Sequence, residues 1–133
     1  MTKARLRKYR ALKRESEWIA NRIEVLENML YSPRMAHLTG MPKAYNPNSG
    51  KLESAIDLVM SLRAKYDTRF NRLITEEIEV LTAITDLPYR EWEVITAYYI
   101  DGKTWQKVAE ITHQSLRSVQ RLHSAALKRM QAN

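Results

Sequence analysis

The sequence predicts an all-α protein in which a long, coiled-coil-like helical hairpin precedes a smaller domain of short helices. Apolar side chains recur at steps of three and four residues along two long stretches, which is the spacing of one helix face. The chain of 133 residues has three glycines and four prolines, and most of them lie within residues 32–50. Capping and turn residues then follow one another closely after Leu87, which predicts short helices in that part of the chain.

The first long helix is expected over residues 3–31. Its apolar positions are Tyr9, Leu12, Ile19, Ile23, Leu26 and Leu30, with one polar break at Ser16. Pro33 disfavours helical geometry in the residue before it, so this helix must end by Ser32.

A loop is expected over residues 32–50, followed by a second long helix over residues 51–85. The loop is long for a compact domain, and such loops are either mobile surface connections or functional segments. The two helices predict an antiparallel hairpin over residues 1–85. Their apolar faces would also allow two copies of the chain to form a homodimer.

Residues 86–133 predict a second domain of short helices, because caps and turns are dense there. They are Asp86 as a cap with Pro88 in the first turn, Asp101–Gly102 as a turn, Thr104 as a second cap, residues 112–114 as a tight turn and Ser115 as a third cap. A short helix, a tight turn and a longer helix are the helix-turn-helix plan. Ala109 leaves room for the two helices to cross, and Val119 is expected to pack against the crossing.

Aromatic side chains in this domain have two readings. Trp92, Tyr98, Tyr99 and Trp105 lie at helical spacing, which favours packing in the core. Aromatic rings can also stack on the bases of single-stranded nucleic acid.

The net charge of +7 is concentrated at the two ends of the chain. Residues 1–14 carry seven basic and no acidic side chains, and residues 102–133 carry six and one, whereas residues 51–101 carry six and ten. Basic ends favour a polyanion partner such as nucleic acid. A solubilising tail and a solvated helix face would give the same counts.

The start of the last helix carries side chains that recognise double-stranded DNA. Arg bonds guanine through two atoms, Gln bonds adenine in the same way, and Ser bonds phosphate or a base edge. The first residues of such a helix enter the major groove. The predicted DNA contacts are Ser115, Leu116, Arg117, Ser118, Gln120 and Arg121 of the last helix, His113 and Gln114 of the turn, Thr104 at the preceding cap, and Lys3, Arg5, Arg7 and Lys8 at the N-terminus.

Several functional classes are not expected. The absence of cysteine excludes disulfides, thiolate zinc sites and a Cys nucleophile. His113 and His123 lie outside any metal-binding spacing, and the adjacent Glu76, Glu77 and Glu79 point to different helix faces, so we expect no metal site, no cofactor and no enzyme. With no membrane span or secretory leader in the sequence, a cytoplasmic location in a bacterial host is expected.

Residues 87–131 resemble region 4 of bacterial sigma factors. The shared features are the Leu-Pro start, an aromatic helix ending in Asp-Gly, the segment TWQKVAEIT, a short turn, and SLRSVQRLHSAALKRM. The resemblance implies that the base and phosphate contacts cluster at Ser115, Leu116, Arg117, Gln120 and Arg121. Leu116-Arg117 replaces the usual Arg-Glu pair and Gln120 replaces an Arg, so the target is expected to differ from an ordinary promoter −35 element.

The whole chain resembles small phage and prophage regulators of the ArpU/late-operon activator type. These share a basic helical N-terminus, a sigma-like C-terminus and a loop matched here by Ser32, Pro33, Arg34, Leu38, Thr39, Gly40, Met41, Pro42 and Lys43. The resemblance implies a transcriptional regulator of phage genes that acts on double-stranded DNA. Two alternatives remain open: an adaptor that docks on RNA polymerase or a sigma factor, and an accessory protein of DNA packaging or recombination.

Overall fold

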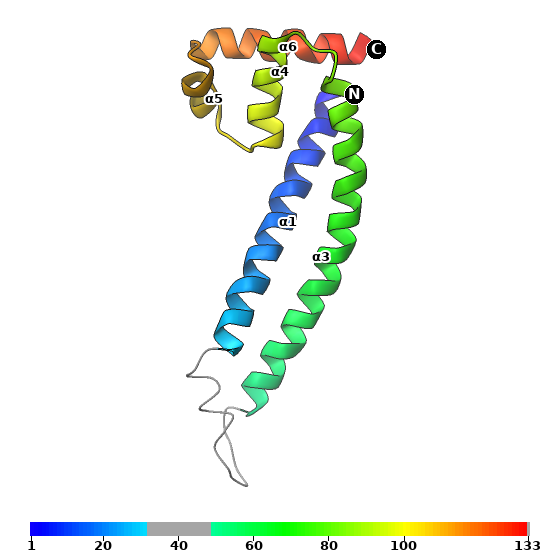
Figure 1. Ribbon diagram of the computed structural model, residues 1–133, viewed down its shortest axis with the longest axis vertical. Helices are drawn as coiled ribbons and strands as arrows, with labels where there is room; N and C mark the ends of the chain where they lie inside the picture. Colours follow the sequence, from blue (N-terminus) through cyan, green and yellow to red (C-terminus); the bar gives the residue numbers. More distant parts are fainter. Residues whose placement is uncertain (32–48, 133) are drawn as a thin grey trace. The chain divides into compact units, whose positions relative to one another are not determined.

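A computed structural model describes residues 1–31 and 49–132, and every regular element among them is helical (Figure 1). The elements are α1 (Lys3–Leu30), α3 (Ser49–Ile84), α4 (Tyr89–Ile95), η1 (Thr96–Ile100), α5 (Trp105–Thr112) and α6 (Leu116–Ala132). The all-α prediction is confirmed. The loop predicted over residues 32–50 falls almost entirely outside the described residues, and its last two residues already belong to α3.

Contacts divide the chain into two compact units, residues 1–14 with 72–133 and residues 15–71. These units do not coincide with the two domains expected from the sequence, residues 1–85 and 86–133. The start of α1 and the end of α3 belong with the C-terminal helices, because all of them share one core. The buried members of that core are Leu6, Tyr9, Leu12, Leu73, Val80, Ile84, Ile95, Tyr99, Ala126, Leu127 and Met130. The basic N-terminus is therefore part of a folded domain rather than a free solubilising tail.

A second core in the same unit holds the helix-turn-helix together. Val94, Ala97, Val108 and Val119 are buried in it. Ala109 and Leu122 pack against this cluster, so Val119 lies at the crossing of α5 and α6 as the sequence predicts. A small residue at position 109 lets the two helices approach closely, as side chains at a crossing set the interaxial distance.

The other unit, residues 15–71, is a pair of helical segments with a thin core. Ile19, Ile23 and Val59 are buried in it. Ion pairs join Arg63 to Glu27 and Arg69 to Glu15. This unit also exposes several large apolar side chains, including Trp18, Met29 and Met60, and the homodimer expected from its apolar faces stays a prediction.

Two predictions for the helix after Leu87 are wrong. Pro88 is the cap residue and not part of the first turn, since its ψ of 147° is extended and α4 begins at Tyr89; no side chain caps that end, so Asp86 does not do so. Trp92 is 38% exposed and stacks on Tyr89 with ring centroids 5.9 Å apart. It lies outside the core because α4 buries Glu91, Val94 and Ile95 instead.

The helix that carries the two central tyrosines widens into a π-helical turn, η1. The backbone N–H of Asp101 donates to the carbonyl of Thr96, five residues back, at 2.9 Å. A π turn inserts one extra residue relative to an α-helix and shifts the faces that follow it. Tyr99 is thereby buried, while Tyr98 is half-buried and stacks on Trp105 with centroids 3.8 Å apart.

Candidate nucleic-acid interface

Local hydrogen bonds cap the starts of α5 and α6, on either side of α5 and the turn that follows it. The Thr104 hydroxyl accepts from the backbone N–H of Lys107 at 3.2 Å, and the Ser115 hydroxyl accepts from that of Ser118 at 3.1 Å. Both predicted caps are therefore confirmed. Between them, His113 adopts the left-handed conformation, with φ 56° and ψ 35°. Residues other than glycine rarely adopt this backbone conformation. The tight turn that requires it fixes the direction in which α6 leaves α5.

The start of α6 presents three polar side chains and one leucine to solvent, in two rows. Leu116 and Gln120 are four residues apart, as are Arg117 and Arg121, so each pair lies on one face of the helix. All four are exposed. Within residues 1–31 and 49–132, neither arginine forms an ion pair or a hydrogen bond. Their guanidinium groups are free to bind an external acceptor.

The other predicted contacts in this module also serve the turn. The Ser115 hydroxyl donates to the hydroxyl of Ser118 at 3.1 Å, in addition to its capping bond. The Gln114 backbone N–H donates to the carbonyl of Ala109 at 3.1 Å. Thr104 and His113 are exposed, while Gln114 and Ser118 are half-buried. The side chains at the start of α6 that have no role in the turn are therefore Leu116, Arg117, Gln120 and Arg121.

Basic side chains of α1 dock on the C-terminal module. The Arg10 guanidinium carbon lies 4.0 Å from the centroid of the Tyr98 ring, and the group donates to the carbonyl of Lys103 at 3.2 Å. The Lys13 ammonium group donates to the carbonyl of Ile100 at 2.5 Å. Such a cation–π contact and charge-assisted hydrogen bonds attach α1 to the end of η1. The sequence identifies both residues as basic but gives no indication of these contacts.

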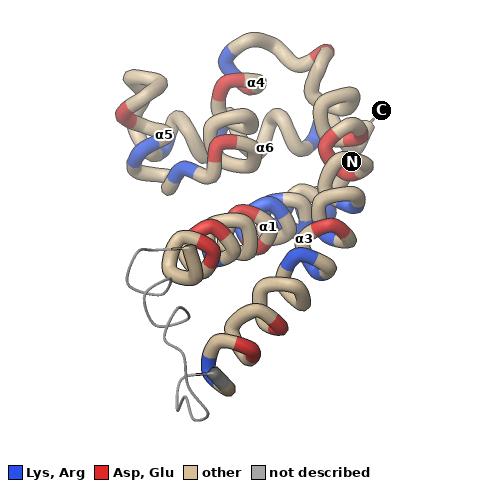
Figure 2. The backbone as a smooth tube through the Cα atoms, turned by 60° about the horizontal axis from the view of Figure 1, so that its bottom comes forward, with Lys and Arg blue, Asp and Glu red and all other residues tan. Residues whose placement is uncertain are grey.

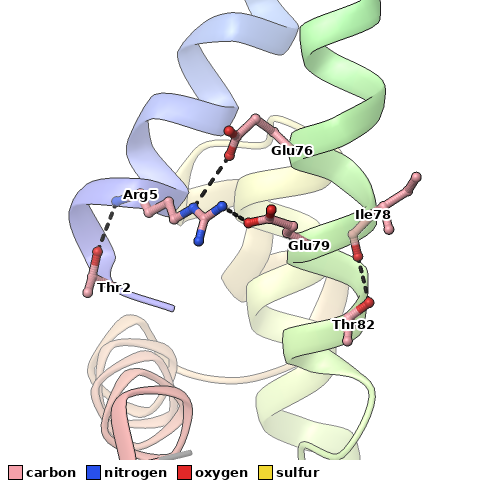
Figure 3. Close-up of polar contacts among 6 residues, drawn as sticks. All are labelled: Thr2, Arg5, Glu76, Ile78, Glu79 and Thr82. Carbon is pink, nitrogen blue, oxygen red and sulfur yellow. Dashed lines mark hydrogen bonds and ion pairs between the residues drawn. The ribbon is translucent and has the colours of Figure 1, made fainter.

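Arg5 is likewise engaged inside the molecule. Its guanidinium group reaches from α1 to two carboxylates of α3, lying 3.5 Å from Glu76 and forming a second ion pair with Glu79 (Figure 3). Glu77 accepts from the Tyr9 hydroxyl at 3.0 Å. The three glutamates thus all bind groups of α1, so the expectation that they point to different helix faces is wrong: Glu76 and Glu79 are three residues apart and lie on one face. Of the N-terminal residues predicted to contact DNA, Lys3, Arg7 and Lys8 remain exposed. Figure 2 marks the basic positions along the backbone in blue and the acidic ones in red.

His123 is one of the buried residues of α6. Its Nε2 lies 2.8 Å from the Tyr99 hydroxyl oxygen. Burial lowers the pKa of His123 to about 4, and the positive charges of Lys3 and Arg7 contribute. Burial, with a smaller contribution from Tyr98, raises the pKa of Tyr99 to about 12. The ring is therefore neutral at pH 7, and Lys3 and Arg7 lie close enough to α6 for their charges to act on it.

A buried carboxylate joins α4 to α6. Glu91 is 6% exposed, and the Nε of Arg129 lies 3.1 Å from one carboxylate oxygen and 3.0 Å from the other. A buried carboxylate is tolerated when a cation and hydrogen bonds compensate it. The two residues are 38 positions apart, so no local spacing in the sequence reveals the pair.

The described residues contain no group of three or more His, Cys, Asp or Glu placed to hold a metal ion. None of the described helices is both long enough and apolar enough to cross a membrane.

Comparison with known proteins returns one finding. No curated protein and no solved structure matches the chain. Residues 77–130, less than half of the chain, match the family model described as sigma-70, region 4. The match begins near the end of α3 and includes α4, η1, α5 and most of α6. The C-terminal part of this chain is thus similar to sigma-70 region 4, a helix-turn-helix domain of DNA-binding or RNA polymerase-related function.

Proposed function

We propose that this protein binds specific sequences of double-stranded DNA and regulates transcription, without catalytic activity. The observation that carries this proposal is the start of α6, where Arg117, Gln120 and Arg121 are exposed and neither arginine has a partner among the described residues. Arg and Gln are the side chains that read guanine and adenine through paired hydrogen bonds. The similarity of residues 77–130 to sigma-70 region 4 supports the same role.

In this proposal the start of α6 enters the major groove and α1 contacts the adjacent backbone. Lys3 and Arg7 act electrostatically on His123, which is one helical turn from Gln120. Both basic residues are exposed, so their cations are available to bind phosphates next to the groove. Thr104 and His113, both exposed at the ends of α5, supply further phosphate contacts. Phosphate contacts position the protein, while base contacts provide specificity.

We further propose which genes the protein regulates. The resemblance of the N-terminal helix and of residues 32–43 to ArpU-type regulators supports activation of late genes of a phage or prophage, in the bacterial cytoplasm. If two copies bind together, their half-sites lie about 10–10.5 base pairs apart or a multiple of that distance.

The direct test is selection of bound duplexes from a random double-stranded library at about 150 mM salt, which suppresses much of the sequence-independent binding. We expect the wild-type protein to enrich one motif and Arg117→Ala to lose it. Arg5→Ala is the matched control, because it also removes one arginine but that arginine is paired with Glu76 and Glu79. Enrichment of no motif by the wild-type protein would contradict the proposal.

One observation favours a second candidate function, an adaptor that docks on RNA polymerase or a sigma factor. Tyr89 is 70% exposed and stacks on the partly exposed Trp92 at the outer face of α4. Exposed aromatic pairs are enriched at protein interfaces. Under this candidate, Tyr89→Ala with Trp92→Ala abolishes capture of purified RNA polymerase holoenzyme, whereas Arg117→Ala leaves it unchanged.

A further inference from the structure

One apolar side chain interrupts the polar face at the start of α6. Leu116 is the first residue of α6 and is 41% exposed. The core cluster between α5 and α6 takes in Ala109 and Leu122, but Leu116 is not a member of it. The exposure of Leu116 therefore has no explanation in the packing of the domain.

The neighbours of Leu116 place it in the middle of the reading face. Gln120 follows it by one helical turn on the same face. Arg117 and Arg121 form the adjacent row, and both are exposed. The hydroxyls of Ser115 and Ser118 form a hydrogen bond with each other. Leu116 is thus one of four side chains here that are free to contact a ligand, and it is the one that cannot form a hydrogen bond.

The major groove offers a single apolar group to such a side chain. Guanine, cytosine and adenine present hydrogen-bond donors and acceptors at their groove edges, whereas thymine also presents its C5-methyl group. An exposed leucine among hydrogen-bonding side chains therefore matches thymine better than any other base. Placing it opposite a polar base edge would remove water from that edge without replacing its hydrogen bonds.

We propose that Leu116 selects thymine at one position of the bound DNA by packing against the C5-methyl group, next to the adenine contact of Gln120. This inference rests on the proposed function and adds to it a methyl-reading contact that hydrogen-bond complementarity alone does not provide. It assigns the contact to a residue at which this chain departs from the sigma-factor pattern.

Deoxyuridine provides the test, because it keeps every hydrogen-bonding group of thymine and lacks only the methyl group. Each thymine of a duplex selected by the wild-type protein is replaced in turn by deoxyuridine, and affinity is measured by fluorescence anisotropy. We expect replacement at one thymine per bound copy to weaken wild-type binding about fourfold, which is the effect of leaving one methyl group unburied. Leu116→Ala should bind the thymine and deoxyuridine duplexes with equal affinity.

Ile111→Ala is the matched control, since Ile111 is an equally exposed apolar residue, at 43%, but lies on α5. It should discriminate between the two duplexes as the wild-type protein does. The inference is overturned if no thymine position affects wild-type binding, or if Leu116→Ala discriminates as well as the wild-type protein. A wild-type protein that selects no motif overturns the proposed function, whereas a selected motif without methyl discrimination overturns this inference alone.

Discussion

The two basic regions of the chain, the start of α1 and the start of α6, use their positive charges differently. In α1, Arg5 pairs with carboxylates, and Arg10 and Lys13 bond backbone carbonyls. In α6, Arg117 and Arg121 have no partner among the described residues. Density of charge is greater in α1, yet three of its cations, Arg5, Arg10 and Lys13, are used to stabilise the fold. A binding surface is therefore identified by unpaired cations rather than by their number.

The largest expected effect tests the α6 side of this comparison. Arg117→Ala should remove about 1–3 kcal/mol of preference for the selected duplex over a shuffled one, because a paired contact to guanine is lost. The measurement is an anisotropy titration with both duplexes at one salt concentration. Arg5→Ala, tested in parallel, should keep the preference. Equal losses on the two duplexes would show that Arg117 binds phosphate instead of a base.

The second effect tests whether the start of α1 covers α6. The pKa of His123 is about 4 in the folded protein and about 6.5 in an unfolded chain. Below pH 6.5 the unfolded state therefore takes up a proton that the folded state does not, so the free energy of unfolding falls as pH decreases toward 4 and is independent of this group above about pH 7. The expected loss between pH 7 and pH 4.5 is about 2 kcal/mol.

Urea unfolding at the two pH values measures this loss, and His123→Gln is the control that removes the titrating group. The wild-type protein should lose more stability than the variant on acidification. An identical loss in both proteins would mean that the ring is accessible to water and that α1 does not cover it.

The third effect separates a structural cation from a binding one. Lys13→Met should lower the free energy of unfolding by about 1–2 kcal/mol, because the hydrogen bond of a charged donor to the Ile100 carbonyl is lost. It should leave the salt dependence of DNA binding unchanged. Arg121→Met should do the reverse, reducing the slope of log affinity against log salt by about one if it binds phosphate, with little effect on stability. A reduced salt slope in Lys13→Met would contradict the assignment of Lys13 to the stability of the fold and not to DNA binding.

The smallest effect concerns the turn before α6. His113 holds a left-handed backbone, with φ 56°, that glycine adopts without steric penalty. His113→Gly should therefore raise the free energy of unfolding by up to about 1 kcal/mol, as measured by urea unfolding. Affinity for DNA should fall, since a phosphate contact is removed. Unchanged affinity in the stabilised variant would exclude His113 from the interface.

The parts of the fold that follow from local chemistry could be predicted from the sequence. Thr104 and Ser115 cap their helices as expected, because a cap depends on residues two or three positions away. Val119 lies at the predicted crossing because the spacing of apolar residues fixes the inward face of α6. The candidate reading face was predictable for the same reason, since the outward positions of a helix follow from its inward ones.

Contacts between distant residues could not be predicted in this way. The pairing of Glu91 with Arg129 and the hydrogen bond of Tyr99 to His123 each depend on how α4, η1 and α6 pack together. Trp92 was assigned to the core wrongly, because the packing of α4 against the other helices buries Glu91, Val94 and Ile95 and leaves Trp92 outside that face. The ion pairs of Arg5 with Glu76 and Glu79 could not be predicted either, because a count of charged residues does not say which of them are in contact.

The most direct test of the central claim is the affinity of the wild-type protein for its selected duplex and for a shuffled duplex across a salt series. If about six phosphates are contacted, log affinity should fall with log salt with a slope near −5 on the selected duplex. The selected duplex should bind at least about a thousandfold more tightly at physiological salt. Equal affinities on both duplexes at every salt concentration would contradict the claim that α6 reads sequence.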